Sequence, residues 1–323
     1  MNVLSLFDGI SCGQIALERA GIKVDDYFAS EIDKYAMKVT QKNYPNTIQL
    51  GDVKEIDVSK LPKIDLLIGG SPCTNFSFIG KKNGMSTIDK LDIISLEQYL
   101  KLKSDNFIFD GYSYLFWEYI RILKEAQPKY FLLENVKMEE KWKNIISSVI
   151  GTKPILINSS LVSSQSRNRL YWTNIPNITI PIKKDININE ELAEYPIWKP
   201  STIFVKNKQK FIKFTNKMSC LTTYCGNPNG IGRPFWAKKE EGISKPFDYS
   251  KVKRISTMQA EILQTLPLNY TSIISDNQRY KSIGNGWTVD VIAHIFKSLK
   301  NNSNSVEFEG IKNQNIIDYL SDI

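Results

Sequence analysis

The chain has 323 residues, of which 42% are hydrophobic, enough to bury the core of one large domain and a smaller second one. This composition excludes a disordered tail and a mini-protein. No cationic leader opens the sequence and no run of about 18 apolar residues occurs, so we expect a soluble, intracellular protein. The four cysteines form no CxxC pair and no His-rich spacing accompanies them, so we expect neither a metal site nor a disulfide framework.

The positive charge is concentrated in one segment. The net charge is +8, from 42 basic and 34 acidic residues. Residues 181–254 contain 15 Lys and Arg but only 7 Asp and Glu, so this segment accounts for the whole excess and the rest is neutral. Such a segment can neutralise several phosphates and predicts nucleic acid as the partner. A solvated lysine-rich surface is the alternative.

Strands and helices alternate through about the first half of the chain. A strand-like run leads through the glycine turn of Gly9 and Gly13 into a helix that Gly21 ends. Two strand–helix units in succession predict a parallel, doubly wound sheet of the α/β class. The expected strands are 3–7, 27–31, 47–50 and 130–133, and the expected helices are 14–20, 32–44 and 114–126.

Residues 64–73 read Ile-Asp-Leu-Leu-Ile-Gly-Gly-Ser-Pro-Cys. The short apolar run bounded by glycine is typical of a buried parallel strand, and Pro72 fixes one φ angle directly before Cys73. In open α/β sheets ligands bind beyond the carboxyl ends of the strands, so Cys73 is a candidate nucleophile. The alternative is that Cys73 is a small buried hydrophobic residue.

The alternation fades from about Trp172. Residues 173–271 are rich in Pro, Asn, Lys and Thr and show neither a repeat nor a clear helical period, which predicts a second, irregular domain. Residues 282–287 then predict the start of another helix, and we make no fold prediction for 83–106. The predicted units are a main α/β domain (1–172 plus 272–300), a second, irregular domain (173–271) and a polar C-terminal tail (301–323).

The ends of the first three strands suggest a nucleoside site. The first turn, residues 7–13, lacks a full GxGxxG motif, but its glycines and the ring of Phe7 suit an adenosine group without phosphates. Glu31 ends the second strand, where a carboxylate typically accepts hydrogen bonds from ribose hydroxyls. Asp52 follows the third strand and could accept from an adenine amino group. Either carboxylate could instead cap a helix.

Seven segments of the chain form an ordered set of motifs. They are Phe7-Asp8-Gly9-Ile10, Ala29-Ser30-Glu31, Gly51-Asp52, Gly70-Ser71-Pro72-Cys73, Glu134-Asn135-Val136, Gln165-Ser166-Arg167-Asn168-Arg169 and Gly284-Asn285-Gly286-Trp287. Together they resemble the ordered motifs of the DNA cytosine-5 methyltransferases, and the resemblance covers most of the chain outside 173–253. The first segment, the run 115–119 and the run 287–289 are also similar to the animal de novo enzymes, and the short N-terminus favours a microbial or phage protein.

The resemblance implies a Rossmann-like sheet that binds S-adenosyl-L-methionine, with a smaller, irregular target-recognition domain that holds duplex DNA. It also implies a covalent mechanism, in which Cys73 adds to C6 of cytosine so that C5 can attack the sulfonium methyl. A free cysteine is mostly protonated at neutral pH, and Arg167 and Arg169 are the candidates for lowering the pKa of Cys73.

The remaining catalytic roles also follow from the resemblance. Glu134 would engage N3 and the exocyclic amine, and Arg169 would contact O2, while Arg167 would support Glu134 and the cysteine loop. A carboxylic acid donates here only if burial raises its pKa, which the apolar strand before Glu134 would achieve. On a strand, Gln165, Arg167 and Arg169 would share one face. Alternatively, Arg167 and Arg169 could be surface charges, and Glu134 could cap the segment that follows it.

The reaction requires that the cytosine leave the duplex, and residues 74–90 predict a mobile lid over the flipped base. The expected cofactor-binding residues are Phe7, Asp8, Gly9, Ile10, Glu31, Ile32, Asp52, Val53, Pro72, Asn285 and Trp287. The expected DNA-binding residues are Thr222, Thr223 and Arg233, in a segment of hydroxyls and glycines suited to groove contacts.

Three alternatives remain open at this point. A transfer-RNA cytosine-5 methyltransferase would share the catalytic residues, and a catalytically silent nucleic-acid-binding relative would share the fold. A thiol hydrolase would need a pair of Cys73 with His294, the single histidine. We expect a monomer, and a cognate restriction endonuclease is a candidate partner. The sequence departs from the usual microbial pattern at 74–77 and at Gln259-Ala260, where the family has Glu-Cys.

Overall fold

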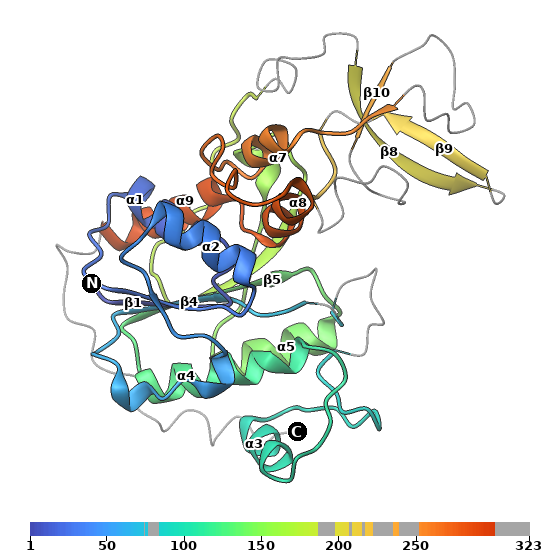
Figure 1. Ribbon diagram of the computed structural model, residues 1–323. Helices are drawn as coiled ribbons and strands as arrows, with labels where there is room; N and C mark the ends of the chain where they lie inside the picture. Colours follow the sequence, from blue (N-terminus) through green and yellow to red (C-terminus); the bar gives the residue numbers. More distant parts are fainter. Residues whose placement is uncertain are drawn as a thin grey trace.

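The structure is a computed structural model that describes residues 1–73, 75–76, 84–186, 198–206, 209–214, 217–221, 235–238 and 252–300. Figure 1 shows a large layered body and, beyond α7 and α8, a small separate sheet. The strands of the large sheet are β1 (Val3–Leu6), β2 (Tyr27–Ser30), β3 (Ile48–Gln49), β4 (Leu66–Gly70), β5 (Tyr130–Val136), β6 (Ile155–Asn158) and β7 (Asn168–Thr173). The helices are α1 (Cys12–Ala20), α2 (Lys34–Asn43), α3 (Leu96–Ser104), α4 (Phe116–Ala126), α5 (Glu140–Ile150), α7 (Thr257–Leu263), α8 (Asp276–Asn285) and α9 (Val289–Lys300).

The large sheet has the strand order β3-β2-β1-β4-β5-β7-β6. Neighbouring strands from β3 to β5 pair in parallel, while β7 runs antiparallel to both β5 and β6. The doubly wound sheet expected from the sequence is therefore confirmed. The direction of winding reverses between β1 and β4, and in such sheets the crevice for a ligand lies outside the carboxyl ends of the strands at this point.

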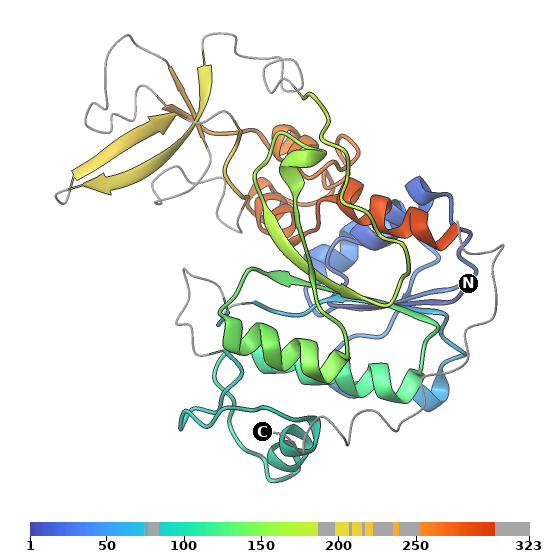
Figure 2. The same cartoon turned by 180° about the vertical axis from the view of Figure 1, so that it is seen from behind.

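Alternating side chains of the strands divide between two cores. Val3, Leu66 and Ile68 belong to the cluster under α1, α2 and α9, while Leu4 and Leu67 belong to the cluster under α4 and α5. The two views show these helix layers on opposite faces of the sheet (Figures 1 and 2). Both faces are buried, which explains why the strands read as continuous apolar runs rather than as alternating patterns.

Most expected elements are present with shifted ends. Gly21 caps α1 in the left-handed conformation at φ 66°, as its position in the sequence predicted. The strand expected at 130–133 continues to Val136, because its last residues pair with the antiparallel β7: Glu134 lies opposite Tyr171 and Val136 lies opposite Arg169. Glu134 is thus part of a strand rather than of the loop after it.

The expectation of no helix between 173 and 271 is wrong at α7. This helix has seven residues, too few to show a clear apolar period, although its capping box of Ser256 and Gln259 is a local signal that could have revealed it. The prediction for 282–287 is also wrong in detail. These residues end the polar helix α8 at Asn285, and the next helix starts at Val289.

The described part of the second unit is a four-stranded antiparallel sheet with the order β11-β10-β8-β9, more regular than the sequence suggested. Its strands are β8 (Trp198–Lys206), β9 (Gln209–Phe214), β10 (Phe235–Lys238) and β11 (Val252–Lys253). The division of the chain into units stays a prediction. Because Ile255, Ala260, Leu263 and Tyr270 pack in the core with α1 and α9, they favour a boundary near 254 rather than at 272.

The segment between β4 and α4, for which the sequence gave no prediction, contains α3. Ser95 accepts a hydrogen bond from the Gln98 amide and so caps its first turn. The fully buried Glu118 of α4 binds Tyr99 of α3 at 2.5 Å and Lys103 at 2.7 Å, which ties α3 to the body. Among all described residues, no helix is long and apolar enough to cross a membrane, and no cluster of His, Cys, Asp and Glu could hold a metal ion.

Candidate active site

The carboxyl ends of four parallel strands meet at one edge of the large sheet. The register places Leu6 of β1 between Ser30 of β2 and Gly69 of β4, and places Gly70 of β4 opposite Glu134 of β5. The loops that follow these strands carry most of the residues expected to bind the cofactor and to react. Segments far apart in the sequence therefore converge at the point where the winding of the sheet reverses.

The loop after β1 has three residues in the left-handed region. Phe7, Gly9 and Ser11 have φ angles of 56°, 60° and 59°. Glu31 holds this loop, since its Oε2 accepts a hydrogen bond from the Gly9 amide at 2.8 Å. Its Oε1 accepts from the amides of Ile32 and the next residue, both at 2.8 Å. Glu31 thus couples the ends of β1 and β2, which fixes the shape of the loop.

The carboxylate of Asp8 faces into the protein. It accepts hydrogen bonds from the hydroxyls of Tyr27 at 2.8 Å and Ser11 at 2.5 Å. Burial raises the pKa of Asp8 to about 6, against the opposing effect of the hydroxyl donors. The geometry makes Asp8 a support of the loop, and its direct contact with a cofactor stays a prediction.

Ile32 and Glu31, at the end of β2, can both contact a ligand. Ile32 is 73% exposed, an unusual position for a large apolar side chain beside a glycine loop. Each carboxylate oxygen has two lone pairs, so Glu31 can accept from ribose hydroxyls in addition to the amides that it binds. Asp52 lies after β3, where it accepts from the Lys54 amide at 3.0 Å and pairs with the Lys54 ammonium at 3.1 Å. These groups fit an adenosine moiety.

The other residues expected to bind the cofactor differ in how deeply they are buried. Ile10 and Val53 are buried in the two cores, so their side chains support the site from beneath. Asn285 is exposed and is the last residue of α8, and Pro72 is half-buried in the loop after β4. Their contacts with a cofactor remain predictions.

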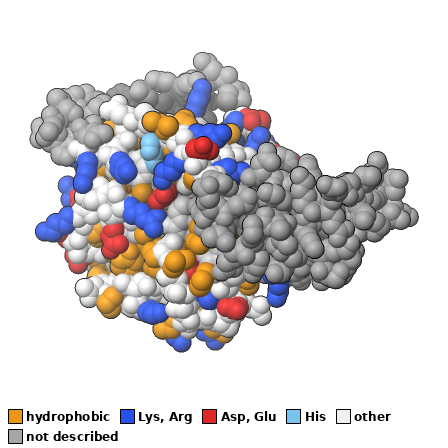
Figure 3. Space-filling view, turned by 90° about the horizontal axis from the view of Figure 1, so that it is seen from above, with side chains coloured by type: hydrophobic (Ala, Val, Ile, Leu, Met, Phe, Trp, Pro, Cys, Tyr) orange, Lys and Arg blue, Asp and Glu red, His pale blue; other side chains and the backbone are white. Residues whose placement is uncertain are grey.

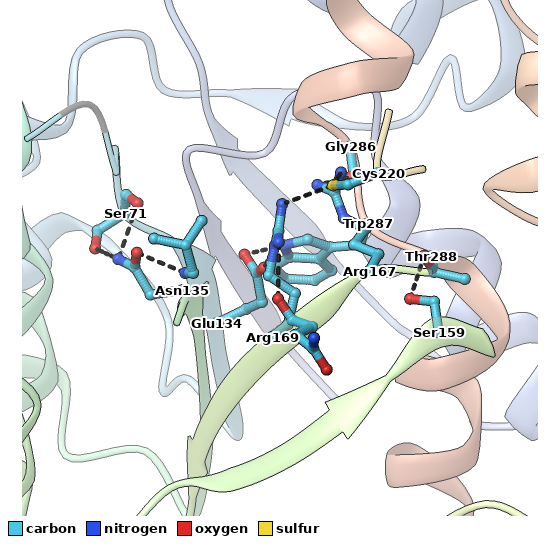
Figure 4. A network of polar contacts seen from close by, with 12 residues as sticks. Ser71, Glu134, Asn135, Ser159, Arg167, Arg169, Cys220, Gly286, Trp287 and Thr288 are labelled. Carbon is cyan, nitrogen blue, oxygen red and sulfur yellow. Dashed lines mark hydrogen bonds and ion pairs between the residues drawn. The ribbon is translucent and has the colours of Figure 1, made fainter. Parts of the chain in front are cut away.

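Asn135 anchors the loop that carries Cys73. Its side-chain amide donates to the Ser71 carbonyl at 3.2 Å and to the Ser71 hydroxyl at 3.0 Å, so the end of β5 fixes the backbone two residues before the sulfur (Figure 4). On the other side, the Phe76 amide donates to the Cys73 carbonyl at 3.0 Å. The half-buried thiol is thus held on a fixed loop at the carboxyl end of β4.

Glu134 is held at both of its oxygens (Figure 4). Arg169 Nε lies 2.8 Å from Oε1, and Trp287 Nε1 donates to Oε2 at 3.1 Å. Gly70 lies so close that a Cβ atom there would be 2.9 Å from Trp287 Nε1 and 3.0 Å from Glu134 Oε2. The glycine before the Ser-Pro-Cys turn therefore leaves room for a carboxylate whose orientation is fixed by two donors.

Arg167 has a different place from the one expected. Its Nη2 donates to the carbonyls of Gly284 at 3.3 Å and Gly286 at 3.0 Å, and its Nη1 donates to the Leu221 carbonyl at 2.9 Å. It therefore joins the end of α8 to the segment 217–221, and none of these bonds reaches Glu134. The shared strand face is also wrong for Gln165 and Arg167, because β7 begins only at Asn168.

The surroundings of Cys73 do not activate it. Burial raises the pKa of the Cys73 thiol above its ordinary value, and the charge of Glu134 adds to this effect. Arg169 and, to a lesser degree, Arg167 act in the opposite direction without reversing the shift. Each arginine therefore lowers the pKa of Cys73 as expected, but the expectation of a lowered pKa is wrong because burial and Glu134 outweigh both arginines.

Comparison with known proteins identifies the family. A profile described as "C-5 cytosine-specific DNA methylase" matches residues 1–177 and 161–301. The chain belongs to the C-5 cytosine-specific DNA methylase family. The loops at the carboxyl ends of β1, β4 and β5 and the segment 165–169 all lie within the matched ranges, so the site just described is a region that this methylase chain shares with its family.

Curated relatives of this methylase come from phage and bacteria. Over 230 residues it is 33% identical to "Orphan methyltransferase M.SPRI" of Bacillus phage SPR, which covers 67% of this chain and 45% of the relative. Over 224 residues it is 29% identical to "Type II methyltransferase M.FnuDI" of Fusobacterium nucleatum, which covers 64% of this chain and 54% of the relative. The chain thus spans about half the length of these relatives.

Solved structures show the same fold. The Entamoeba histolytica methyltransferase EhMeth superposes with a TM-score of 0.65 at 16% identity, over 94% of this chain and 99% of the other. An E. coli structure described as a putative DNA modification methyltransferase encoded within a prophage superposes with a TM-score of 0.56 at 19% identity, over 94% and 100% of the two chains. At these identities the likeness concerns the fold of the methylase alone.

Some sequence predictions lie outside the described residues. These are Thr222, Thr223 and Arg233, together with residues 74 and 77–83 of the predicted lid. In the described end of the lid, Met85 and Thr87 are buried whereas Ile88 is exposed, and the mobility of the lid stays a prediction. His294 Nε2 lies 2.8 Å from the Thr179 carbonyl oxygen, and no described contact joins His294 to Cys73, which argues against a thiol hydrolase.

Sequence reasoning missed two residues at the site. Asn135 belongs to the motif Glu134-Asn135-Val136 but has no predicted role, although an amide directly after a candidate catalytic carboxylate is a local signal. Cys220 contacts both arginines of the site, and nothing in the local sequence distinguishes it. Its position depends on a contact between residues more than 50 positions apart.

Proposed function

We propose that this protein is a DNA (cytosine-5-)-methyltransferase that methylates C5 of a flipped cytosine in duplex DNA. The observation that carries the proposal is the convergence of Cys73, Glu134 and Arg169 at one sheet edge, beside a loop suited to adenosine, in a chain of this family. When bound, S-adenosyl-L-methionine would supply the methyl group. The loop 7–11, Glu31 and Ile32 are the residues that would hold it.

The proposed chemistry begins at Cys73. Its thiolate adds to C6 of the cytosine, and the electron pair of the C5–C6 bond becomes available at C5 for attack on a methyl group. Loss of the C5 proton then allows the C6–S bond to break, which returns the thiolate and leaves 5-methylcytosine. Because the resting thiol has a raised pKa, the step before addition is the removal of its proton.

Glu134 and Arg169 would position the base. Arg169 and Trp287 fix the plane of the carboxylate, so Glu134 can meet N3 and the exocyclic amine in a defined orientation. Arg169 is only 14% exposed at its side chain and carries a full charge close to where the pyrimidine O2 would lie in this assignment. Both residues would stabilise the charge that moves into the ring when the sulfur adds.

The charge of the second unit supports DNA as the substrate. The four described strands of the small sheet contain six lysines and no acidic residue. On the face of the molecule in Figure 3, Lys and Arg side chains are instead interspersed with Asp and Glu. A lysine-rich sheet that stands away from the catalytic body is suited to contact phosphates along a duplex. We keep the monomeric state and a cognate endonuclease as expectations.

The test is methyl transfer from labelled S-adenosyl-L-methionine to unmethylated duplex DNA or to transfer RNA. Label in the DNA, located at C5 of cytosine by bisulfite sequencing, supports the proposal. Label in transfer RNA alone would refute the choice of substrate. Label in neither would refute the activity.

A duplex that contains 5-fluorocytosine tests the nucleophile separately. With S-adenosyl-L-methionine present, the fluorine at C5 cannot leave as a proton does after methyl transfer, so the adduct with Cys73 should accumulate. Cys73→Ser should form no adduct, whereas Cys12→Ser, which changes another cysteine, should still form it. An adduct in the Cys73→Ser protein would show that the nucleophile is misassigned.

A further inference from the structure

A second thiol lies within the active-site arginine pair. Cys220 Sγ is 3.4 Å from Arg167 Nη1 and 3.9 Å from Arg169 Nη2 (Figure 4). As a thiol, Cys220 donates to the Leu221 carbonyl at 3.4 Å, a bond that its thiolate form would give up, and Arg167 donates to that same carbonyl. Arg169 contacts Glu134 through its Nε, so one guanidinium joins the catalytic carboxylate to the Cys220 sulfur.

The charges of this cluster do not balance. Arg167 and Arg169 carry two positive charges, whereas Glu134 supplies one negative charge. One positive charge is left, and two thiols lie in the field of the same arginines: Cys73 on the loop after β4 and Cys220 on the segment 217–221. A single excess charge can stabilise one thiolate well but not two.

The direct contacts favour Cys220. Although burial alone raises the pKa of Cys220, the charges of Arg167 and Arg169 and the hydrogen bonds from both outweigh it and lower the pKa below its ordinary value. Burial raises the pKa of Cys73, for which no hydrogen bond from either arginine is present among the described contacts. The two thiols of one site are thus shifted in opposite directions.

We propose that Cys220, as a thiolate, is the counter-ion of Arg167 and Arg169 and withholds their charge from Cys73. Cys220 is then a positioning residue of the site, since it acts on the nucleophile through the two guanidinium groups. This relation between the two thiols applies to the protein without DNA or cofactor. Its effect on catalysis rests on the proposed function, in which Cys73 is the nucleophile.

The other titratable groups around the cluster do not supply a competing charge. Tyr171 of β7 is buried, and burial raises its pKa above the ordinary value, so it remains neutral. Burial likewise raises the pKa of Cys12, which lies under Gly286, to about 12. Lys217 binds the carbonyls of Ser160 and Ser163 at 3.2 and 2.9 Å.

This arrangement protects the nucleophile. The thiolate is the form that alkylating agents and oxidants attack, so a protonated Cys73 reacts slowly with them until a bound cytosine changes its surroundings. Displacement of Cys220 from the arginines would free the positive charge for Cys73.

The test measures alkylation of each cysteine by iodoacetamide between pH 5.5 and 10, with each site resolved by mass spectrometry and without DNA or cofactor. In the wild-type protein, Cys220 should react at lower pH than Cys73. In Cys220→Ser and Cys220→Ala, the midpoint for Cys73 should fall by about one pH unit, so Cys73 should be alkylated about tenfold faster at pH 7. Glu134→Gln is the matched comparison, because it removes a negative charge from the other side of Arg169 and should shift Cys73 in the same direction.

The outcomes separate this proposal from the proposed function. If the midpoint of Cys73 is unchanged in both folded Cys220 variants while Glu134→Gln lowers it, Cys220 holds no charge and the proposal is wrong. A wild-type Cys220 that reacts only at higher pH than Cys73 would also overturn it. The assay involves no methyl transfer, so its result is independent of whether the protein methylates DNA.

Discussion

Asp8 makes the free protein less stable as the pH rises. Its pKa in the folded chain is about 6, against an ordinary value of 3.8, because burial disfavours the charged form. The folded state therefore binds a proton that the unfolded chain has lost, and the stabilisation from this proton disappears as the pH rises through about 6. Taken at its full value, this pKa shift lowers the free energy of unfolding by roughly 1.4 kcal/mol between pH 5 and pH 8. We expect a decrease of about 1 kcal/mol, because Asp8 is only half-buried and solvent screens its charge.

Asp8→Asn isolates this contribution. Its carbonyl oxygen can still accept from Tyr27, and its amide can donate to Ser11, so the variant keeps the shape of the loop without a titrating group. We expect the free energy of unfolding of the variant, relative to wild type, to increase by about 1 kcal/mol between pH 5 and pH 8. Urea denaturation followed by tryptophan fluorescence measures this difference, in which the pH effects of all other groups cancel.

Asp33→Asn is the control. Although partial burial raises the pKa of Asp33, the hydrogen bonds from Lys281 and the Tyr35 amide outweigh it and lower the pKa. Stability from a lowered carboxyl pKa is fully present above the ordinary value of 3.8 and is lost only as the pH falls further. The difference between wild type and Asp33→Asn should thus be constant from pH 5 to pH 8. A constant difference for Asp8→Asn as well would refute the reasoning.

Three further substitutions test the site. Trp287→Phe keeps an aromatic ring but removes the hydrogen bond to Glu134, and kcat/KM for methyl transfer should fall about tenfold; an unchanged value would show that this bond does not orient the carboxylate. Asn135→Ala removes both bonds to Ser71 and should cost about 1–3 kcal/mol in urea denaturation, more than Ser71→Ala, which removes only the hydroxyl contact. Glu31→Ala should weaken cofactor binding in calorimetry at least tenfold, by roughly 1.4 kcal/mol, and equal affinity would exclude Glu31 from the site.

The parts of the site that the sequence predicted are those coded by neighbouring residues. Apolar runs bounded by glycine predicted the parallel strands, and residues at the strand ends, such as Glu31 and Cys73, followed from the rule that parallel strands end at the same edge. Where local signals were weak, the prediction failed. Short α7 and polar α8 have no clear apolar period, and they form because their few apolar residues pack in the core with α1 and α9.

By itself the sequence determined the class of fold, the order of the motifs and the residue types available for chemistry. Only the tertiary structure decided how these residues act on one another. Trp287 reaches Glu134 across 153 positions, and Arg167 binds Gly286 across 119 positions. The pKa of Cys73 likewise depends on burial, on Glu134 and on two arginines together. Such contacts and sums depend on distances in space, which a pattern of neighbouring residues does not contain.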